Sequence, residues 1–177
     1  MLARLLYRIE IAGTVPPGPV IVAANHESML DPPLLALAAR QPLHFLAKAE
    51  LWRYRPGAWL MDALGGIPIR RDRRDLLSVG RAEELLHAGE SVAIFPQGTV
   101  QGGAWTRGAA RLALATGAPL VPVRIVGTKR ALSKGRLGFP RIRLVVCEPI
   151  PVERARPTIA AAKELTAELE KRVDAAR

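Results

Sequence analysis

A histidine and an aspartate lie five positions apart in the segment "AANHESMLDPP", residues 23–33, where an apolar run ends. A carboxylate can fix the tautomer of an imidazole and stabilise its charged form, so that the second ring nitrogen accepts a proton from a substrate. On one continuous helix, five residues would turn Asp31 about 140° away from His26. We therefore expect His26 on a turn after a strand, with Asp31 reaching back to it from the start of a helix.

Asp31 also has a purely structural interpretation, as the cap of a helix. Aspartate is favoured at a helix N-cap, and proline is favoured at the first helical position that follows. Ser28 and Asp31 also fit the S-x-x-D pattern of a helix N-terminus. The two roles are compatible, because one carboxylate oxygen could cap the helix while the other holds the histidine. His26 itself could be a loop histidine that is satisfied by the backbone.

The remaining histidines and the single cysteine favour structural roles. His44 lies inside a predicted strand with no acid nearby, and His87 lies in the last turn of a predicted helix, where a cation favours the helix dipole. Cys147 lies in the apolar run "IRLVVC" and is interpreted as a buried strand residue in a reducing compartment. One cysteine and three scattered histidines do not have zinc-ligand spacing, so the sequence predicts no metal site.

Predicted strands alternate with predicted helices along the chain. The strands are expected at 7–13, 20–25, 43–50, 67–75 (a short extended piece running into a charge cluster), 91–99, 118–128 and 141–150. The helices are expected at 32–40, 51–66 (broken at Pro56), 75–89, 106–117 and 158–177, with a basic loop at 129–140. This order predicts one α/β layered domain over residues 1–177, in which helices flank a central mixed, largely parallel sheet.

The charge balance predicts an anionic partner. Lys and Arg number 26 against 16 Asp and Glu, which gives a formal net charge of +10. Such a surface suits nucleic acid, a lipid headgroup surface or a phosphorylated substrate, and it could also be a solvated surface of an arginine-rich protein. Aromatics are only 5% and no nucleic-acid motif is visible, so a basic nucleic-acid-binding module is kept as a minor alternative.

No targeting or membrane-spanning segment is visible. The first ten residues interrupt their apolar positions with charges, and no stretch approaches the ~20 apolar residues that a bilayer core requires. Trp52, Tyr54 and Trp59 lie among arginines and could form an interfacial segment or pack in the core. We expect a cytoplasmic protein that associates peripherally with the inner face of an anionic membrane.

The chain resembles the glycerolipid acyltransferases, the family typified by 1-acyl-sn-glycerol-3-phosphate acyltransferase. Its segment "NHESMLD" matches the family signature N-H-x-S-x-x-D, and further blocks follow in family order. The lysine-bearing segment is similar to "FLAKAEL", with Lys48, and the second block to "GGIPIRR", with Arg71. The third block is similar to "FPQGT", the fourth to "GAPLVPVRI" around Pro122, and the closing strand to "CEPIPV". The resemblance extends from Ile9 to Val152.

The resemblance implies a glycerol-3-phosphate acyltransferase-like fold and transfer of a fatty acyl group from acyl-CoA or acyl carrier protein to a lysophospholipid hydroxyl. The implied acceptor is 1-acyl-glycerol-3-phosphate, with His26 as general base oriented by Asp31 and with no cofactor besides the acyl donor. An alcohol is a poor nucleophile near neutral pH, so such a base suits the reaction. The implied substrate-binding residues are Asn25, Lys48, Arg71, Gln97, Gly98, Thr99 and Arg107. Backbone N–H groups of "QGT" or the Lys48 ammonium could stabilise the developing oxyanion.

Two departures from the family pattern affect the expected acceptor. Gln97 and Val100 stand where the family usually carries Glu and Arg in the third block. Gln97 keeps hydrogen-bonding capacity without the charge, and Val100 removes an expected phosphate ligand. Arg107 and Arg124 are candidates to replace that charge, although Arg124 could be a surface residue at a strand end. The departures favour a second hypothesis, in which the acceptor is a sugar, an amine or a non-phosphate lipid.

Overall fold

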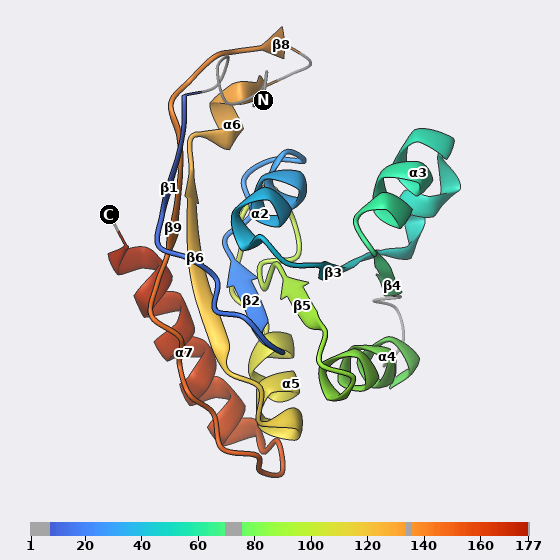
Figure 1. Cartoon of the computed structure of the whole chain (residues 1–177), viewed down its shortest axis with the longest axis vertical. Helices are drawn as coiled ribbons and strands as arrows, with labels where there is room; N and C mark the ends of the chain where they lie inside the picture. The colour runs from blue at the N-terminus through green and yellow to red at the C-terminus, as the bar shows by residue number, and fades with distance from the viewer. Residues whose placement is uncertain (1–7, 70–75, 134–135, 177) are drawn as a thin grey trace.

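The chain is built around one sheet of short strands, which a computed structural model describes over residues 8–69, 76–133 and 136–176 (Figure 1). The strands are β1 (Ile9–Ala12), β2 (Ile21–Ala24), β3 (Leu43–Lys48), β4 (Ile67–Ile69), β5 (Ser91–Ile94), β6 (Leu120–Val126), β7 (Leu132–Ser133), β8 (Arg136–Leu137) and β9 (Ile142–Val146). The helices are α2 (Asp31–Ala39), the 3-10 helix η1 (Ala49–Arg53), α3 (Arg55–Ala63), α4 (Leu76–His87), α5 (Gly108–Thr116), α6 (Thr128–Ala131) and α7 (Ile159–Ala175).

Within the described residues, the main sheet has seven strands in the order β1-β9-β6-β2-β5-β3-β4, and β7 and β8 form a separate pair. The strands β6, β2, β5, β3 and β4 run parallel to one another, whereas β9 is antiparallel to β6 and parallel to β1. The expected α/β fold with a mixed, largely parallel sheet flanked by helices is therefore confirmed. Because five neighbouring strands are parallel, their carboxyl ends meet at one edge of the sheet.

Helices cover both faces of the sheet, which explains the unbroken apolar runs of its central strands (Figure 1). Every residue of β2 and of β5 is buried. On one face, Val22 and Ala24 pack with the buried residues of α2. On the other face, Ile21 and Ala23 pack with buried residues of α4, α5 and α7. The alternation of strand side chains thus divides the core into two layers, between which β2 is held rigidly.

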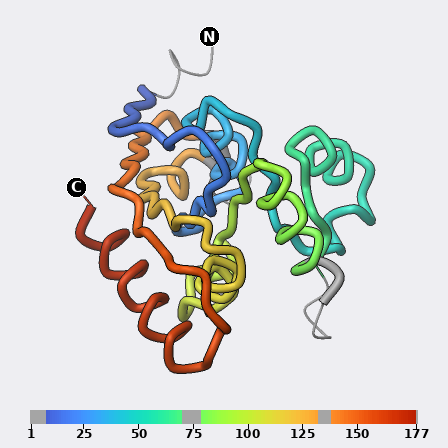
Figure 2. Tube along the Cα trace, turned by 60° about the horizontal axis from the view of Figure 1, so that its bottom comes forward, coloured from blue at the N-terminus to red at the C-terminus, as the bar shows by residue number. Residues whose placement is uncertain are grey.

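The segment 51–66 was predicted as a broken helix, and this prediction is confirmed. The 3-10 helix η1 ends at Arg53, Tyr54 is extended, and α3 begins just before Pro56. Two glycines follow α3, and a Cβ at Gly66 would lie 2.9 Å from the ring of Trp52. The η1–α3 hairpin, which we define as residues 49–63, stands out from the rest of the chain on the β3–β4 side (Figure 2).

Two predictions about loops and strand ends are wrong. The basic segment 129–140 was expected to be an open loop, but it contains the end of α6 and the β7–β8 pair. Cys147 was expected to be buried within a strand, but it is half-buried and lies one residue beyond β9. Burial still raises the pKa of the Cys147 thiol, against the opposing charge of Arg172.

Candidate active site

The candidate site begins where β2 ends, at Asn25. This side chain is buried, and it pairs twice with the backbone of β6: Nδ2 donates to the Ile125 carbonyl at 2.8 Å, and the Ile125 N–H donates to Oδ1 at 2.7 Å. These contacts give Asn25 a structural role, since both polar atoms bond the backbone, and its expected role in substrate binding stays a prediction. Asn25 instead anchors the first residue of the turn to the neighbouring strand.

Asp31 organises the rest of the turn through one oxygen. The residue is fully buried, and its Oδ2 accepts hydrogen bonds from His26 Nδ1 at 2.8 Å, from Glu27 N at 2.7 Å and from Ser28 N at 2.8 Å. The second oxygen, Oδ1, has no hydrogen-bond partner among the described residues. Such charge-assisted bonds offset the cost of burying a carboxylate. The expected pairing of His26 with Asp31, reaching back from the helix start, is therefore observed.

The alternative role of Asp31 as a helix cap is wrong. The helix α2 begins at Asp31 itself, its N-cap residue is Leu30, and no side chain caps its first turn. The Asp31 carboxylate points backward to the His26 turn instead of forward to the helix N–H groups, because three donors converge there. The S-x-x-D pattern therefore belongs to the His26 turn and not to a helix cap. Within this turn, Ser28 Oγ accepts a hydrogen bond from Leu30 N at 3.3 Å.

The imidazole of His26 is held by Asp31 and Phe95, and the backbone of His26 is held by Gln97. Its side chain is only 13% exposed, and its ring stacks on Phe95 with 4.3 Å between the ring centroids. Its backbone N–H donates to Gln97 Oε1 at 2.8 Å. A carboxylate can only accept, so Nδ1 carries the proton and Nε2 is left as the basic nitrogen. No residue in the described part of the chain occupies Nε2.

The "FPQGT" turn after β5 contacts the His26 turn and is bonded internally. Gln97 Oε1 accepts the His26 backbone N–H, and the expected role of Gln97 in substrate binding stays a prediction. Gly98 was expected to offer its N–H, but this group donates to the Phe95 carbonyl at 2.9 Å. Thr99 Oγ1 accepts from Gln101 N at 3.3 Å. The Gly98 N–H is therefore engaged in an internal turn bond, and Gln97 holds the backbone of His26.

The expected cations are not gathered around His26. Lys48 is exposed at the end of β3, and Arg107 is exposed just before α5, so both lie near the carboxyl edge of the sheet. Arg71 lies outside the described residues. Arg124 is half-buried in β6, and its Nη1 donates to Asp174 Oδ1 of α7 at 2.8 Å. One nitrogen of Arg124 is thus used in an ion pair with α7, and its candidacy as a phosphate ligand stays a prediction.

Sequence reasoning missed two neighbours of the base. Phe95 was read only as the first letter of a turn motif, but its ring supports the imidazole. Glu27 is half-buried beside His26, and burial, followed by the Asp31 carboxylate, raises the pKa of Glu27 above its ordinary value of 4.5. Arg124, a backbone hydrogen bond with Gly127, and Lys129 oppose this rise. Both positions adjoin recognised motif residues, which is the signal that could have identified them.

The other histidines lie apart from this arrangement. His44 was expected to have no acid nearby, but its Nε2 lies 3.8 Å from Glu90 Oε2, and its Nδ1 lies 3.3 Å from the Gly65 carbonyl oxygen. These contacts suit the structural role that was predicted. His87 is exposed in the last turn of α4. Among the described residues, no three His, Cys, Asp or Glu side chains gather as a metal site would require.

The His26 turn lies where a substrate would be expected to bind. It follows the carboxyl end of a central parallel strand, which is where open α/β sheets bind ligands. A buried carboxylate orients an imidazole there, and the second ring nitrogen is available. The arrangement can remove a proton from a hydroxyl group held beside Nε2.

Comparisons with known proteins agree on the kind of protein to which this chain is similar. A family model described as "Acyltransferase" matches residues 8–126, which include β1 to β6 and the whole His26 turn. The lyso-ornithine lipid O-acyltransferase of Pseudomonas aeruginosa is 38% identical over 102 residues, which cover 57% of this chain and 39% of that protein. A chloroplastic 1-acyl-sn-glycerol-3-phosphate acyltransferase of Arabidopsis thaliana is 30% identical over 162 residues, which cover 84% of this chain and 45% of that protein.

A solved structure has the same fold. The 1-acyl-sn-glycerophosphate acyltransferase PlsC of Thermotoga maritima is 28% identical, with a TM-score of 0.76, and the match covers 93% of this chain and 68% of that one. The chain spans less than half the length of the two relatives above, at 39% and 45%.

Proposed function

Because the chain belongs to the acyltransferase family, we propose that it transfers a fatty acyl group from an acyl thioester to a hydroxyl group of a lysophospholipid, with His26 as general base. The observation that carries this proposal is the 2.8 Å contact between His26 Nδ1 and Asp31 Oδ2, which leaves Nε2 as the basic nitrogen. The expected donor is acyl-CoA or acyl carrier protein, since either supplies a thioester.

The reaction proceeds by direct attack. His26 Nε2 takes the proton of the acceptor hydroxyl as its oxygen attacks the thioester carbonyl, and Asp31 stabilises the imidazolium that results. When the tetrahedral intermediate collapses, the carbon–sulfur bond breaks, and the thiolate leaves with the proton from His26. The products are an ester and a free thiol, and no serine or cysteine intermediate is needed.

The first acceptor class that we propose is 1-acyl-glycerol-3-phosphate. Its support is the resemblance to relatives that bear this substrate in their names, such as the protein of Arabidopsis thaliana. Lys48, Arg107 and Arg71 are the cations that we propose for the phosphate groups of donor and acceptor, because guanidinium and ammonium groups bind phosphate.

A second acceptor class is a lipid without a phosphate headgroup, such as a lyso-ornithine lipid. Three observations favour it. Val100 stands where the resembled family carries an arginine, the acidic side chain of Glu27 lies beside the base, and a 38% identical relative acts on such a lipid according to its name. An ammonium-bearing acceptor would find a carboxylate at Glu27 that a phosphate would not favour.

The test is an acceptor panel with one acyl-CoA, read as release of free thiol. Lysophosphatidate, lyso-ornithine lipid and lysophosphatidylcholine are each given to the purified protein, and acyl carrier protein replaces CoA in a second series. We expect release with one acceptor class and a loss of about 10²- to 10⁴-fold in the His26→Ala variant.

The matched control is His87→Ala, which removes an exposed histidine of α4 and should leave turnover unchanged. Unchanged turnover in His26→Ala would exclude the proposed base. Absence of thiol release with all acceptors and both donors would exclude the proposed reaction.

We also propose that the protein acts at the cytoplasmic face of an anionic membrane, because both acceptor classes are lipids and the chain carries a formal net charge of +10. Over the residues that the structure describes, no helix combines the length and apolarity that a membrane crossing needs.

A further inference from the structure

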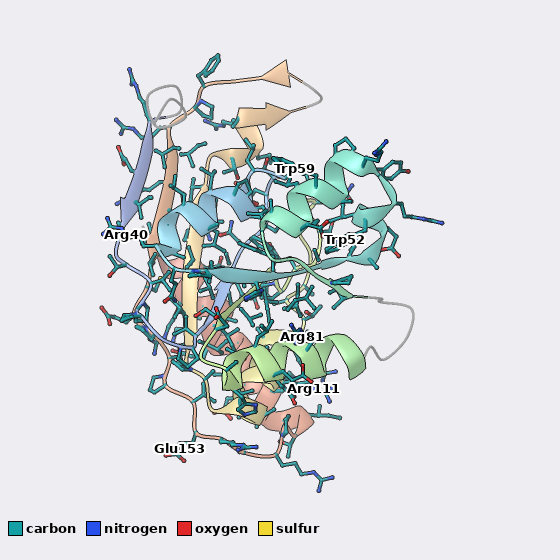
Figure 3. All side chains as sticks on the ribbon, turned by 45° about the vertical axis from the view of Figure 1, so that its right-hand side comes forward. Arg40, Trp52, Trp59, Arg81, Arg111 and Glu153 are labelled. Atoms are coloured by element: carbon teal, nitrogen blue, oxygen red, sulfur yellow. The ribbon has the colours of Figure 1, made fainter. Side chains whose placement is uncertain are left out.

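The aromatic residues of the η1–α3 hairpin divide into one that holds the hairpin together and two that face solvent. Trp52 is half-buried, and its Nε1 donates to Asp62 Oδ1 at 2.8 Å. Tyr54 and Trp59 are each 73% exposed. The two interpretations of this segment, interfacial or packed, therefore apply to different residues. Figure 3 labels Trp52 and Trp59 on opposite sides of α3.

The two exposed rings lie within one short segment, five residues apart in the chain. Arg55 and Trp59 are four residues apart on α3, so they share one face of this helix, and Tyr54 directly precedes it. Outside the hairpin, Phe45 is buried, Phe95 and Trp105 are partly buried against the core, and Phe139, two residues beyond β8, is 63% exposed. Isolated exposed rings need no explanation, whereas two on one short segment indicate a binding surface.

Cations flank these rings. Lys48, Arg53 and Arg55 are exposed, and none of them forms an ion pair within the described part of the chain. Of the two acids nearby, Asp62 accepts the Trp52 N–H, and Glu50 is exposed. Tryptophan and tyrosine with unpaired arginine are the side chains that favour the headgroup layer of an anionic bilayer. This charge complementarity favours a lipid surface over a protein partner.

The hairpin is placed to serve the His26 turn. It follows Lys48 at the carboxyl end of β3, and β3 is parallel to β5, whose carboxyl end carries the Gln97 contact to His26. The hairpin therefore begins at the sheet edge that bears the base, and it projects from the chain there (Figures 1 and 2). A lipid acceptor could keep its acyl chain in the bilayer while its hydroxyl group reaches that edge.

We propose that the η1–α3 hairpin is the surface through which the protein binds an anionic bilayer, with Trp59 and Tyr54 in the headgroup layer and Arg53 and Arg55 on lipid phosphates. This inference rests on the proposed function in one respect, which is that the acceptor is a lipid.

The test is flotation with vesicles of phosphatidylcholine alone and of phosphatidylcholine mixed with phosphatidylglycerol. We expect the wild-type protein to float with the mixed vesicles and its tryptophan emission to shift to the blue. The Tyr54→Ala/Trp59→Ala variant should bind at least about tenfold more weakly and lose the shift, because it lacks both interfacial rings. The Arg53→Gln/Arg55→Gln variant should lose the preference for anionic vesicles.

The matched control is Arg111→Gln/Ile159→Ala. It removes an exposed arginine of α5 and the 74% exposed Ile159 of α7, and it should float like the wild type. Thermal melting by circular dichroism verifies that each variant is folded. Equal flotation of the hairpin and control variants would overturn the proposal, as would wild-type binding that is equal on neutral and anionic vesicles. Self-association that the Tyr54→Ala/Trp59→Ala variant abolishes, without vesicle binding, would overturn it and assign the surface to a second copy of the chain.

Thiol release from a detergent-dispersed acceptor separates this inference from the proposed function. The Tyr54→Ala/Trp59→Ala variant should retain wild-type turnover there, since it lacks only the bilayer contact. If the wild type binds anionic vesicles but releases no thiol with any acceptor, the proposed function fails and the membrane surface stands. If thiol release is intact and vesicle binding is absent, the membrane surface fails alone.

Discussion

The His26 turn and the η1–α3 hairpin use aromatic and charged residues in opposite ways. In the turn, the charge of Asp31 is buried under three donors, and the ring of Phe95 packs against the imidazole. In the hairpin, Trp59 and Tyr54 are exposed. A base must point at one hydroxyl group, which requires a rotamer locked by its neighbours. A bilayer has no fixed geometry, so a surface that binds it needs amphipathic side chains but no locked positions.

The two regions also differ in what holds them in place. The His26 turn is bonded to β6 through Asn25 and to the β5 turn through Gln97, so it is supported from both neighbouring strands. The described contacts of the hairpin are mainly internal, including the bond between Trp52 and Asp62. Damage to the first region should therefore affect chemistry and folding together, whereas damage to the second should remain local.

The largest effect is expected from Asp31→Asn. The substitution removes the charge that His26 Nδ1 and two backbone N–H groups share, so turnover should fall by about 10²- to 10⁴-fold. Because hydrogen bonds to a buried charge are lost, the free energy of unfolding should fall by on the order of 3 kcal/mol. Thiol release and urea denaturation measure the two quantities.

The control for Asp31→Asn is Asp174→Asn, which removes the exposed partner of Arg124. A surface ion pair contributes at most about 1 kcal/mol, so this variant should retain its activity and nearly all of its stability. If both variants lost activity and stability to the same extent, the proposed difference between the buried Asp31 contacts and a surface ion pair would be wrong.

A smaller effect is expected from Trp52→Phe, which keeps a ring in the hairpin but removes the donor to Asp62. The free energy of unfolding should fall by about 1 kcal/mol. Amide hydrogen exchange should accelerate within residues 49–63, while turnover on a detergent-dispersed acceptor stays within about twofold, because local opening leaves the His26 turn intact. Trp59→Phe is the matched control and should change neither the free energy of unfolding nor the rate of amide exchange. Loss of turnover in Trp52→Phe would show that the hairpin and the turn are mechanically coupled.

The smallest effect is expected from Glu27→Gln and depends on pH. Burial raises the pKa of Glu27 above its ordinary value of 4.5, so ionising this carboxyl costs more in the folded protein than in the unfolded chain and lowers the stability of the fold at neutral pH. Glutamine removes this penalty, and the melting temperature at pH 7 should rise by less than about 3 °C. The difference should vanish as the pH falls below 4.5, where the acid is protonated in both folded and unfolded states.

The control for Glu27→Gln is Glu153→Gln, an exposed residue that should show no such dependence (Figure 3). A melting temperature that falls at pH 7 in Glu27→Gln would mean that the carboxylate stabilises the turn, contrary to this expectation.

The elements of the fold were largely predictable because each has a local cause. Alternation marked β1, apolar β-branched runs marked β2 and β5, and helical spacing marked α4 and α7. The errors concern places where local signals are weak. The segment 129–140 is rich in glycine and basic residues, which are typical of loops, yet it includes a short helix and the β7–β8 pair. Cys147 lies only one residue beyond β9, within the usual uncertainty of a strand end.

The site was predictable in its chemistry and less so in its contacts. The pairing of His26 with Asp31 followed from five residues of sequence and the geometry of a helix. The roles of Asn25 and Gln97 did not, because their partners lie 100 and 71 residues away in the chain. An amide side chain looks the same in sequence whether it bonds a substrate or a distant backbone.

The amino-acid sequence by itself determined which residues can exchange a proton, and it determined that strands and helices alternate, because both depend on neighbouring residues. The tertiary structure alone decided that Asn25 and Gln97 support the base, that Arg124 is paired with Asp174, and that Trp52 is internal while Trp59 is exposed. The physical reason is that a side chain's hydrogen bonds and burial depend on which strands become neighbours in the sheet, and strands distant in the chain meet only when it folds.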